Sequence, residues 1–380
     1  MKVLHVFKTF WPDTFGGIER SIDGIARATA PHGVESEVFS LSRWPDREPR
    51  TFNGARLTRA KLDHEFASTG ISFQAFGLLE EAARRNDLIH YHFPWPFMDL
   101  LHFALRTRRP SVVTYHSDIV RQKFLNALYR PLGEAFLKRM DAIVATSPNY
   151  LETSPVLRRH RERTTVIPIG LDRSAYPDPG SEDVASVRLP CPEPYFLFVG
   201  VGRYYKGLDV LVEAARLCGL NVVIAGAVDM PAPANVHFVG PVSERAKVRL
   251  IRGAAGFVLS SHLRSEAFGL ALLEAAMFGR PLISCEIGTG TTYINIDRQT
   301  GLVVPPGDPA ALAAAMREIV DDPVRAEAWG AAARARFEEI FTAESMGRGY
   351  AKLYAAILAR NPETRPTSSG SASAPAADNR

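Results

Sequence analysis

A polar loop that runs into an apolar helix, at residues 264–281, constrains this chain more than any other stretch. The helix is rich in Ala, Leu and Met, which predicts that it is buried, and Gly279 followed by Pro281 predicts its end. Glu266 precedes the helix and Glu274 lies on it, eight residues later. Because an unpaired charge within an apolar helix is unfavourable, the position of Glu274 argues against a surface residue without a function.

The two carboxylates and the backbone between them are suited to a polar ligand. An ionised carboxylate only accepts hydrogen bonds, so it pairs well with neighbouring hydroxyl groups. Phe268, Gly269 and Leu270 offer free backbone N–H groups at a helix N-terminus, where anions and hydroxyls bind. The alternative is that Glu266 only stabilises the positive end of the helix and that Glu274 is a surface residue.

Predicted strands and helices alternate along the whole chain, which indicates the α/β class. Apolar runs typical of buried parallel strands occur in two series, one within residues 1–172 and one within residues 190–345. Residues 173–189 are rich in Pro, Ser and Asp, as expected for a linker. A length of 380 residues also favours two domains. Residues 361–380 lack bulky apolar side chains, so we expect a disordered tail.

The charge distribution restricts the classes of partner. The formal net charge is +4, and the positive excess lies in residues 1–172, which hold 24 Lys and Arg against 19 Asp and Glu. This excess is too small for a dedicated nucleic-acid-binding protein, but it suits an anionic membrane surface or a phosphorylated ligand. The three cysteines are scattered, and no apolar run is long enough to span a bilayer. We therefore expect a cytoplasmic protein.

Residues 119–140 form a basic amphipathic segment in which Lys and Arg are interleaved with Phe, Leu and Tyr. Such a helix can lie on an anionic membrane, which predicts a peripheral protein at the inner face of the plasma membrane. The alternative is a helix that packs its apolar face on the core and exposes its cations to water.

Two adjacent glycines follow the first predicted strand, in the region where ligands of open α/β sheets bind. Gly16 and Gly17 let the backbone approach a ligand closely, and Glu19 opens the helix that follows. An ordinary strand–helix loop is the alternative.

Polar residues also follow the strand predicted at 111–115, where His116 and Asp118 lie. A histidine at the end of a strand is more often a satisfied structural residue than a functional one. We expect that structural role for His90 and His92.

A second glycine-rich loop, after the strand that opens the second series, carries Arg203 and Lys206. Two cations beside glycines at a helix start suit a diphosphate, and two solvated surface cations are the alternative. The loop lacks the Gly-x-Gly-x-x-Gly spacing of a nicotinamide site, which disfavours a dehydrogenase. A later loop, suited to a phosphate or to a plain turn, contains Thr289, Gly290 and Thr291.

The Glu-x7-Glu pair with its internal Phe-Gly, followed by Ala-x-x-x-Gly-x-Pro, resembles the signature of retaining glycosyltransferase family 4. The resemblance covers nearly the whole chain. It implies the GT-B fold, in which two Rossmann-like domains face a central cleft. The acceptor domain would be residues 1–172 and the nucleotide-sugar donor domain residues 190–345. The helix at 346–360 would cross back to the first domain.

The resemblance implies a role for each candidate residue. Glu274 is expected to hold the ribose hydroxyls of a nucleotide-diphosphate sugar, while Lys206 and Arg203 neutralise the departing diphosphate. Glu266 is expected to orient the sugar, with His116 near the anomeric centre or the 6-hydroxyl. The other expected donor-binding residues are Gly16, Gly17, Val242, Phe268, Gly269, Leu270, Thr289, Gly290 and Thr291.

The resemblance leaves one position open. The family places an Arg directly after the first glycine of the second glycine-rich loop, where this chain has Val201. Arg203 either substitutes from two residues away or belongs to a shortened loop. On the acceptor side, the expected contacts are Glu19 and Asp118.

The resemblance implies an enzyme that transfers a hexosyl unit with retention, without a cofactor or a bound metal ion. Residues 203–207 and 287–295 resemble those of bacterial mannosyl- and rhamnosyltransferases, which favours GDP-mannose as the donor. The expected acceptor is a lipid-linked glycan of the O-antigen type, as in lipopolysaccharide biosynthesis. The alternatives are a UDP-sugar donor, a nucleotide-sugar epimerase, and a non-catalytic glycan-binding protein.

Overall fold

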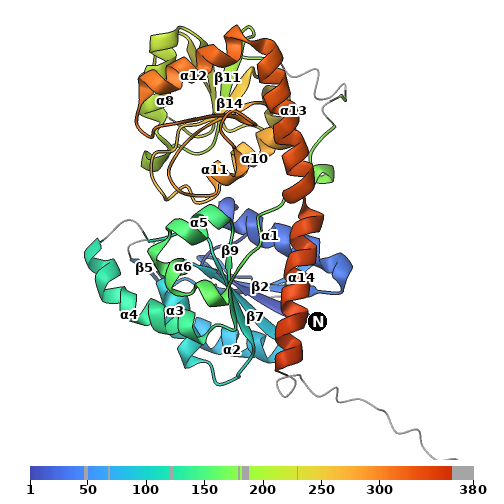
Figure 1. Ribbon diagram of the computed structural model, residues 1–380. Helices are drawn as coiled ribbons and strands as arrows, with labels where there is room; N and C mark the ends of the chain where they lie inside the picture. Colours follow the sequence, from blue (N-terminus) through green and yellow to red (C-terminus); the bar gives the residue numbers. More distant parts are fainter. Residues whose placement is uncertain are drawn as a thin grey trace, which may run out of the picture.

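The computed structural model describes residues 1–46, 50–66, 69–119, 123–178, 180–181, 188–228 and 230–361, with positions 123–127 described as backbone only. Two α/β domains lie one above the other (Figure 1). The predicted α/β class is therefore confirmed. The predicted disordered tail lies outside the described residues from residue 362 onward, as do positions 179 and 182–187 of the predicted linker.

The N-terminal domain is built on an eight-stranded sheet in the order β10-β9-β8-β7-β1-β2-β4-β3, which is parallel except for the edge pair β3–β4. The strands of this sheet are β1 (Lys2–Val6), β2 (Glu35–Ser42), β3 (Arg50–Phe52), β4 (Ala55–Lys61), β7 (Leu88–Phe93), β8 (Ser111–Tyr115), β9 (Ala142–Ala145) and β10 (Thr164–Val166). A small separate hairpin consists of β5 (His64–Phe66) and β6 (Thr69–Ile71). The α-helices of the domain are α1 (Gly17–Thr29), α2 (Ala75–Arg85), α3 (Pro96–Ala104), α4 (Lys123–Arg139), α5 (Pro148–Thr153) and α6 (Pro155–Arg159).

The C-terminal domain is built on a six-stranded, fully parallel sheet in the order β13-β12-β11-β14-β15-β16. Its strands are β11 (Tyr195–Val199), β12 (Asn221–Ala225), β13 (Val236–Gly240), β14 (Gly256–Leu259), β15 (Leu282–Cys285) and β16 (Gly301–Val304). The α-helices that follow the interdomain segment are α8 (Leu208–Cys218), α9 (Glu244–Gly253), α10 (Leu270–Met277), α11 (Thr291–Ile294), α12 (Pro309–Asp321), α13 (Pro323–Ile340) and α14 (Ala343–Arg360).

The central strands form because their side chains are apolar on both faces, as parallel strands covered by helices require. All side chains of β7, β8 and β14 are buried. Polar caps fix where the helices begin: the Ser243 and Asp308 side chains accept hydrogen bonds from backbone N–H groups at the starts of α9 and α12. None of the described helices combines the length and the apolar character that crossing a membrane requires.

The chain passes between the domains twice, and the two passages are hydrogen-bonded to each other. Leu171 N donates to Phe341 O at 2.9 Å, and Ala343 N donates to Leu171 O at 3.0 Å. After the second passage, α14 lies on the N-terminal domain against α1, whereas α13 lies on the C-terminal domain (Figure 1). The paired passages form one side of the cleft between the domains.

The contact between α14 and α1 depends on a glycine, and we predict that filling it destabilises the fold. A Cβ atom on Gly347 would lie 2.1 Å from Ala28 O, so Gly347→Ala must push the helices apart. We expect a loss of about 1–3 kcal/mol in the free energy of unfolding, measured by urea denaturation. The control is Gly77→Ala in α2, where a Cβ meets nothing within 4 Å. This change should raise the free energy of unfolding by about 0.5–1 kcal/mol, because alanine restricts the unfolded chain more than glycine does. Equal effects would contradict the prediction.

Candidate active site

A cavity of about 560 Å³ lies between the two domains and is lined by loops that follow strands of both sheets. The N-terminal domain contributes the loop before α1 and the end of β8 to its lining. The C-terminal domain contributes the loops after β11, β12, β13 and β14. Of the residues predicted for the site, those that line the cavity are Gly16, Gly17, His116, Lys206, Val242, Glu266, Phe268, Gly269, Leu270 and Glu274.

The loop between β14 and α10 brings the two predicted carboxylates to the cavity. Gly269 has φ +97°, in the left-handed region, and a Cβ there would lie 3.1 Å from Leu259 Cδ2. Glycine therefore permits the sharp entry into α10 that directs the helix N-terminus at the cavity. Glu274, one helical turn further on, is 4% exposed.

One oxygen of the buried Glu274 carboxylate is fully engaged by protein groups. Its Oε1 accepts hydrogen bonds from Lys247 Nζ at 2.6 Å and from Tyr176 OH at 2.8 Å. Arg20 Nη1 lies 3.5 Å from the same oxygen. Among the described residues Oε2 has no hydrogen-bond partner, so this oxygen can accept hydrogen bonds from a ligand.

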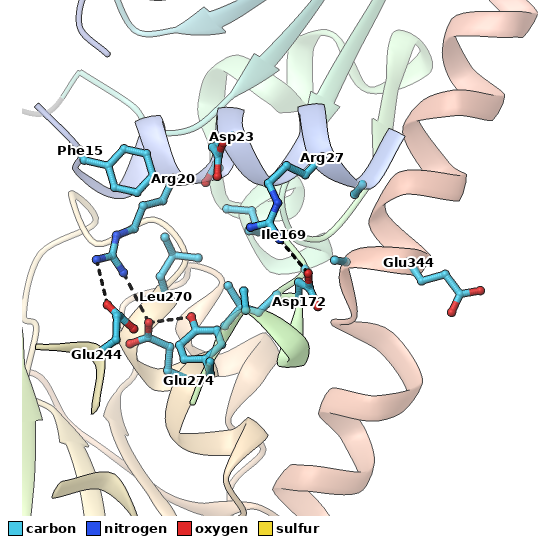
Figure 2. Close-up of a pocket in the computed structure, with 18 of the residues that line it drawn as sticks. Phe15, Arg20, Asp23, Arg27, Ile169, Asp172, Glu244, Leu270, Glu274 and Glu344 are labelled. Carbon is cyan, nitrogen blue, oxygen red and sulfur yellow. Dashed lines mark hydrogen bonds and ion pairs between the residues drawn. The ribbon is translucent and has the colours of Figure 1, made fainter. Parts of the chain in front are cut away.

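Arg20 reaches the C-terminal domain from α1, as Figure 2 shows. Its second nitrogen lies 3.6 Å from Glu244 Oε1 at the start of α9. Arg20, Glu244 and Glu274 also line a neighbouring cavity of about 720 Å³, which extends to the paired passages between the domains. The two cavities share these three charged side chains, so one continuous cleft runs past them.

Glu266 is paired with a cation in a similar way. Lys206 Nζ donates to Glu266 Oε2, and Ser261 Oγ donates to the same oxygen at 3.2 Å. Burial alone would lower the pKa of the Lys206 ammonium, but the adjacent Glu266 carboxylate outweighs burial and raises that pKa above its ordinary value. Lys206 is therefore a fixed positive charge on the wall of the cavity.

The position of Lys206 depends on the glycine that follows it. Gly207 has φ +62°, and a Cβ there would lie 2.2 Å from Ser260 O. Only glycine lets the loop after β11 pack this closely against the end of β14. Lys206 and Glu266, sixty residues apart, are thereby held in contact.

His116 lies at the end of β8 and contacts a second histidine behind it. Its Nε2 is 3.0 Å from His92 Nδ1, and His92 Nε2 is 3.1 Å from His5 Nδ1. Burial lowers the pKa of His116 and of His5 to about 3, so both are neutral at physiological pH. His92, expected from the sequence to be structural only, is thus in direct contact with a cavity residue.

Several predicted residues lie outside the lining of this cavity. Glu19 accepts hydrogen bonds from Thr9 and Thr14, both at 2.7 Å, and so supports the Gly16–Gly17 loop from behind. Asp118 pairs with Arg264 of the other domain at 3.2 Å. Both carboxylates are therefore occupied by protein groups.

The residues predicted to bind phosphate differ in whether they reach the cavity. Val201 lines the cavity, whereas the exposed Arg203 is not among its lining residues. Thr289 donates to Glu266 O at 2.8 Å, and Gly290 N donates to Ala267 O at 2.8 Å. These two residues, like the buried Thr291, do not line the cavity. The loop at 289–291 therefore supports the Glu266 loop from outside the cavity.

Four site residues escaped the sequence interpretation: Arg20, Tyr176, Glu244 and Lys247. Lys247 left a signal, because it is a charged residue beside Val248 on the apolar face of a helix. Arg20 and Tyr176 left none, since their role depends on how the domains and the interdomain segment meet.

Three buried histidines of the described residues are close enough to consider as metal ligands. One nitrogen from each of His5, His90 and His92 lies within 4.8 Å of the others. His90 and His92 already use both ring nitrogens in hydrogen bonds, including His90 Nδ1 to Tyr354 OH at 2.7 Å. The prediction of no metal site stays a prediction.

Sequence comparison gives two family matches that together span most of the chain. The description "Glycosyltransferase Family 4" matches residues 15–175, and "Glycosyl transferases group 1" matches residues 181–336. The D-rhamnosyltransferase WbpZ of Pseudomonas aeruginosa is 48% identical over 353 residues, which cover 90% of this chain and 93% of that protein. The chain belongs to glycosyltransferase family 4. It is an enzyme, as that family predicts.

Further comparisons agree with this family 4 assignment. The O-antigen chain mannosyltransferase C of Escherichia coli is 45% identical over 370 residues, which cover 94% of this chain and 99% of that protein. Among solved structures, a sucrose-phosphate synthase from Thermosynechococcus elongatus superposes with a TM-score of 0.76 at 24% identity. The superposition covers 94% of this chain and 99% of that one, and it supports the GT-B fold.

The contacts of Glu274 predict unequal roles for its two cations. Lys247→Met removes a buried cation at 2.6 Å, so we expect the free energy of unfolding to fall by about 3 kcal/mol. Arg20→Met removes a cation whose side chain is 42% exposed, at 3.5 Å, and should cost at most about 1 kcal/mol. Urea denaturation of both variants tests this order. The double variant Lys247→Met/Glu274→Met should recover most of the loss, and failure to recover would contradict the pairing.

Proposed function

We propose that this glycosyltransferase moves a mannosyl or rhamnosyl unit from a GDP-linked sugar to a hydroxyl group of a lipid-linked glycan of the O-antigen type. Two relatives that match almost the whole chain are named for O-antigen mannosyl transfer and for D-rhamnosyl transfer. Rhamnose is the 6-deoxy form of mannose, so one pocket can accommodate either sugar. The carrying observation is that Glu266 and Glu274 each retain hydrogen-bonding capacity toward a cavity that also contains Lys206.

Each charged group of the cavity has a role in this proposal. Glu274 Oε2 accepts hydrogen bonds from the ribose hydroxyls, because its other oxygen is held by Lys247. Lys206 and the N–H groups at the start of α10 stabilise the diphosphate as it departs, so no metal ion is needed for that charge. Glu266 orients the sugar next to His116.

Retention of the anomeric configuration is also part of the proposal. The carboxylates that line the cavity, Glu244, Glu266 and Glu274, are each paired with a lysine. A paired carboxylate is a poorer nucleophile, so we favour attack on the front face of the sugar, assisted by the leaving phosphate, over a covalent intermediate. A glycosyl group trapped on any of these residues would overturn this step.

Glu244 is the residue that favours guanine over uracil in this proposal. It lines the cavity beside Glu274, and both carboxylates lie within 3 Å of Lys247 Nζ. The guanine edge offers two adjacent donors, N1–H and N2–H, which match the two oxygens of a carboxylate. Uracil offers a single N–H group that lies between two carbonyl oxygens. These oxygens and those of a carboxylate repel one another.

Calorimetric binding of GDP, UDP and ADP, without metal and then with magnesium, tests the donor. We expect selective binding of GDP that needs no metal. In Glu244→Gln the preference for GDP over UDP should fall roughly 10-fold or more, because one charged hydrogen-bond acceptor is lost. The matched control Glu213→Gln removes an exposed carboxylate of α8 that pairs with Arg216 and should change nothing.

Other outcomes of this binding experiment would change either the proposed donor or the proposed catalytic function. Selective binding of UDP would keep the fold and the reaction but discard the GDP donor. Absence of binding by all three nucleotides would favour a non-catalytic glycan-binding protein.

We propose further that the enzyme sits on the cytoplasmic face of an anionic membrane, where its lipid-linked acceptor lies. The supporting feature is a set of exposed apolar side chains on α2, α3 and α4 and just before α2, where α3 packs against both other helices. We define this membrane face by Phe73, Phe76, Leu100, Phe103 and Leu128. Exposed cations in and between the same helices are Arg106, Arg108, Arg130, Lys138 and Arg139. An apolar surface with cations around it suits the boundary of an anionic bilayer.

Sedimentation with liposomes tests the membrane face. We expect binding to vesicles that contain phosphatidylglycerol and weaker binding to neutral phosphatidylcholine vesicles. The triple variant Phe73→Ser/Leu100→Ser/Phe103→Ser should lose at least about 10-fold in vesicle affinity. It removes three of the exposed apolar side chains that would insert into the bilayer. Its affinity for GDP should be unchanged. The control Val324→Ser alters a side chain of α13 that is 80% exposed and should bind vesicles normally. Undiminished binding by the triple variant would contradict the assignment.

A further inference from the structure

A buried row of hydrogen-bonded histidines leads from the cavity into the N-terminal domain. This histidine row consists of His116, His92 and His5, joined by contacts of 3.0 and 3.1 Å between ring nitrogens. His116 lines the cavity, and the other two are fully buried on β7 and β1. Because the bonded atoms are Nε2 of His116 and Nδ1 of His92, the second nitrogen of His116, Nδ1, is the one available to a ligand.

Each ring of the row carries a single proton on its nitrogens. Burial lowers the pKa of all three imidazoles, so each is neutral and has one N–H donor and one acceptor nitrogen. A hydrogen bond needs one donor and one acceptor, so choosing the tautomer of one ring fixes the other two. The row therefore has only two consistent arrangements, and they present opposite groups to the cavity.

The inner end of the row decides between these arrangements. His5 Nε2 is buried and has no hydrogen-bond partner among the described residues. If it carried the proton, a buried N–H group would be left without an acceptor, which is rarer in proteins than a buried acceptor without a donor. His5 therefore carries its proton on Nδ1 and donates to His92 Nε2.

The same arrangement then continues to the cavity. His92 accepts at Nε2, so its proton is on Nδ1 and is donated to His116 Nε2. His116 accepts at Nε2, so its own proton is on Nδ1. The neighbouring His90 does not alter this order, because its partners Tyr354 and Thr114 are hydroxyl groups that can donate or accept.

We propose that His5 and His92 are positioning residues that hold His116 as a hydrogen-bond donor, through Nδ1–H, to an oxygen atom of the bound sugar nucleotide. In this role His116 is not a general base. The inference rests on the proposed function for the identity of the ligand, but the protonation of the row is a property of the protein alone. His116 would stabilise an oxygen of the sugar or of the departing phosphate without moving a proton.

The tautomers of the row can be measured directly. Nitrogen-15 NMR of protein labelled at histidine distinguishes ring nitrogens that carry a proton from those that do not, and His→Gln variants assign the signals. We expect the Nδ1–H tautomer at His5, His92 and His116, with and without GDP. A proton on Nε2 of His116 in the wild-type protein would overturn the inference. So would a stoichiometric metal ion bound to His5, His90 and His92, detected by elemental analysis.

Variants at His92 test whether the row acts on the reaction. His92→Phe breaks both hydrogen bonds, so we expect kcat to fall roughly 10- to 100-fold, as when the partner that orients a functional histidine is lost. His92→Gln can accept from His5 and donate to His116, so it should restore most of kcat. The KM for the donor and the affinity for GDP should change little, because Lys206 and Glu274 lie in the other domain.

A matched control separates positioning from packing. His90→Gln replaces an equally buried histidine outside the row and should keep kcat near the wild-type value. If folded His92→Gln is as slow as His92→Phe, or if His92→Phe changes KM and leaves kcat intact, the positioning role is wrong. Absence of sugar transfer by the wild-type enzyme would instead refute the proposed function, while the NMR spectrum would still decide the tautomers.

Discussion

The site depends on two lysine–glutamate pairs that supply partners to buried carboxylates at the cavity. Lys206 pairs with Glu266, and Lys247 pairs with Glu274. A buried carboxylate without such a partner would be costly or would take up a proton. In both pairs the lysine engages one oxygen of the carboxylate and leaves the other with capacity for a ligand. The same contacts therefore stabilise the folded chain and prepare the cavity for hydroxyl groups.

Polar contacts join the two domains around the cleft that contains these pairs. Besides the paired passages at residues 171 and 341–343, the domains meet through ion pairs of Arg20 and Arg264. Hydrogen bonds of α5 also cross between them, such as Asn149 Nδ2 to Thr292 Oγ1 at 3.1 Å. The Arg20 side chain is 42% exposed, and exposed ion pairs contribute roughly 0–1 kcal/mol. Arg20 also contacts the carboxylate proposed to bind ribose. The contact between the domains uses Oε1 of this carboxylate, so Oε2 stays open to the donor while Arg20 is in place.

Much of the fold and part of the site could be predicted from local sequence. The buried parallel strands and the helix after Glu266 follow from apolar runs and from helix-ending residues that act over a few positions. The spacing of Glu266 and Glu274 indicated a paired site, and both line the cavity. The three-residue strands β3, β5 and β6 escaped prediction, because they are short and carry no buried apolar run. Glu19, Asp118 and the 289–291 loop have the right residue types, but protein partners take up their hydrogen-bonding groups.

The sequence by itself determined the α/β class, the family resemblance and the two carboxylates, since each depends on residues close together along the chain. Only the tertiary structure decided which charged groups share the cavity. It brought Arg20, Tyr176 and Lys247 to Glu274, excluded Arg203 from the cavity lining, and placed His92 and His5 behind His116. The physical reason is that these contacts join residues from different strands and different domains. Their partners are fixed by strand order, by the paired passages between the domains and by the glycines that let loops approach closely.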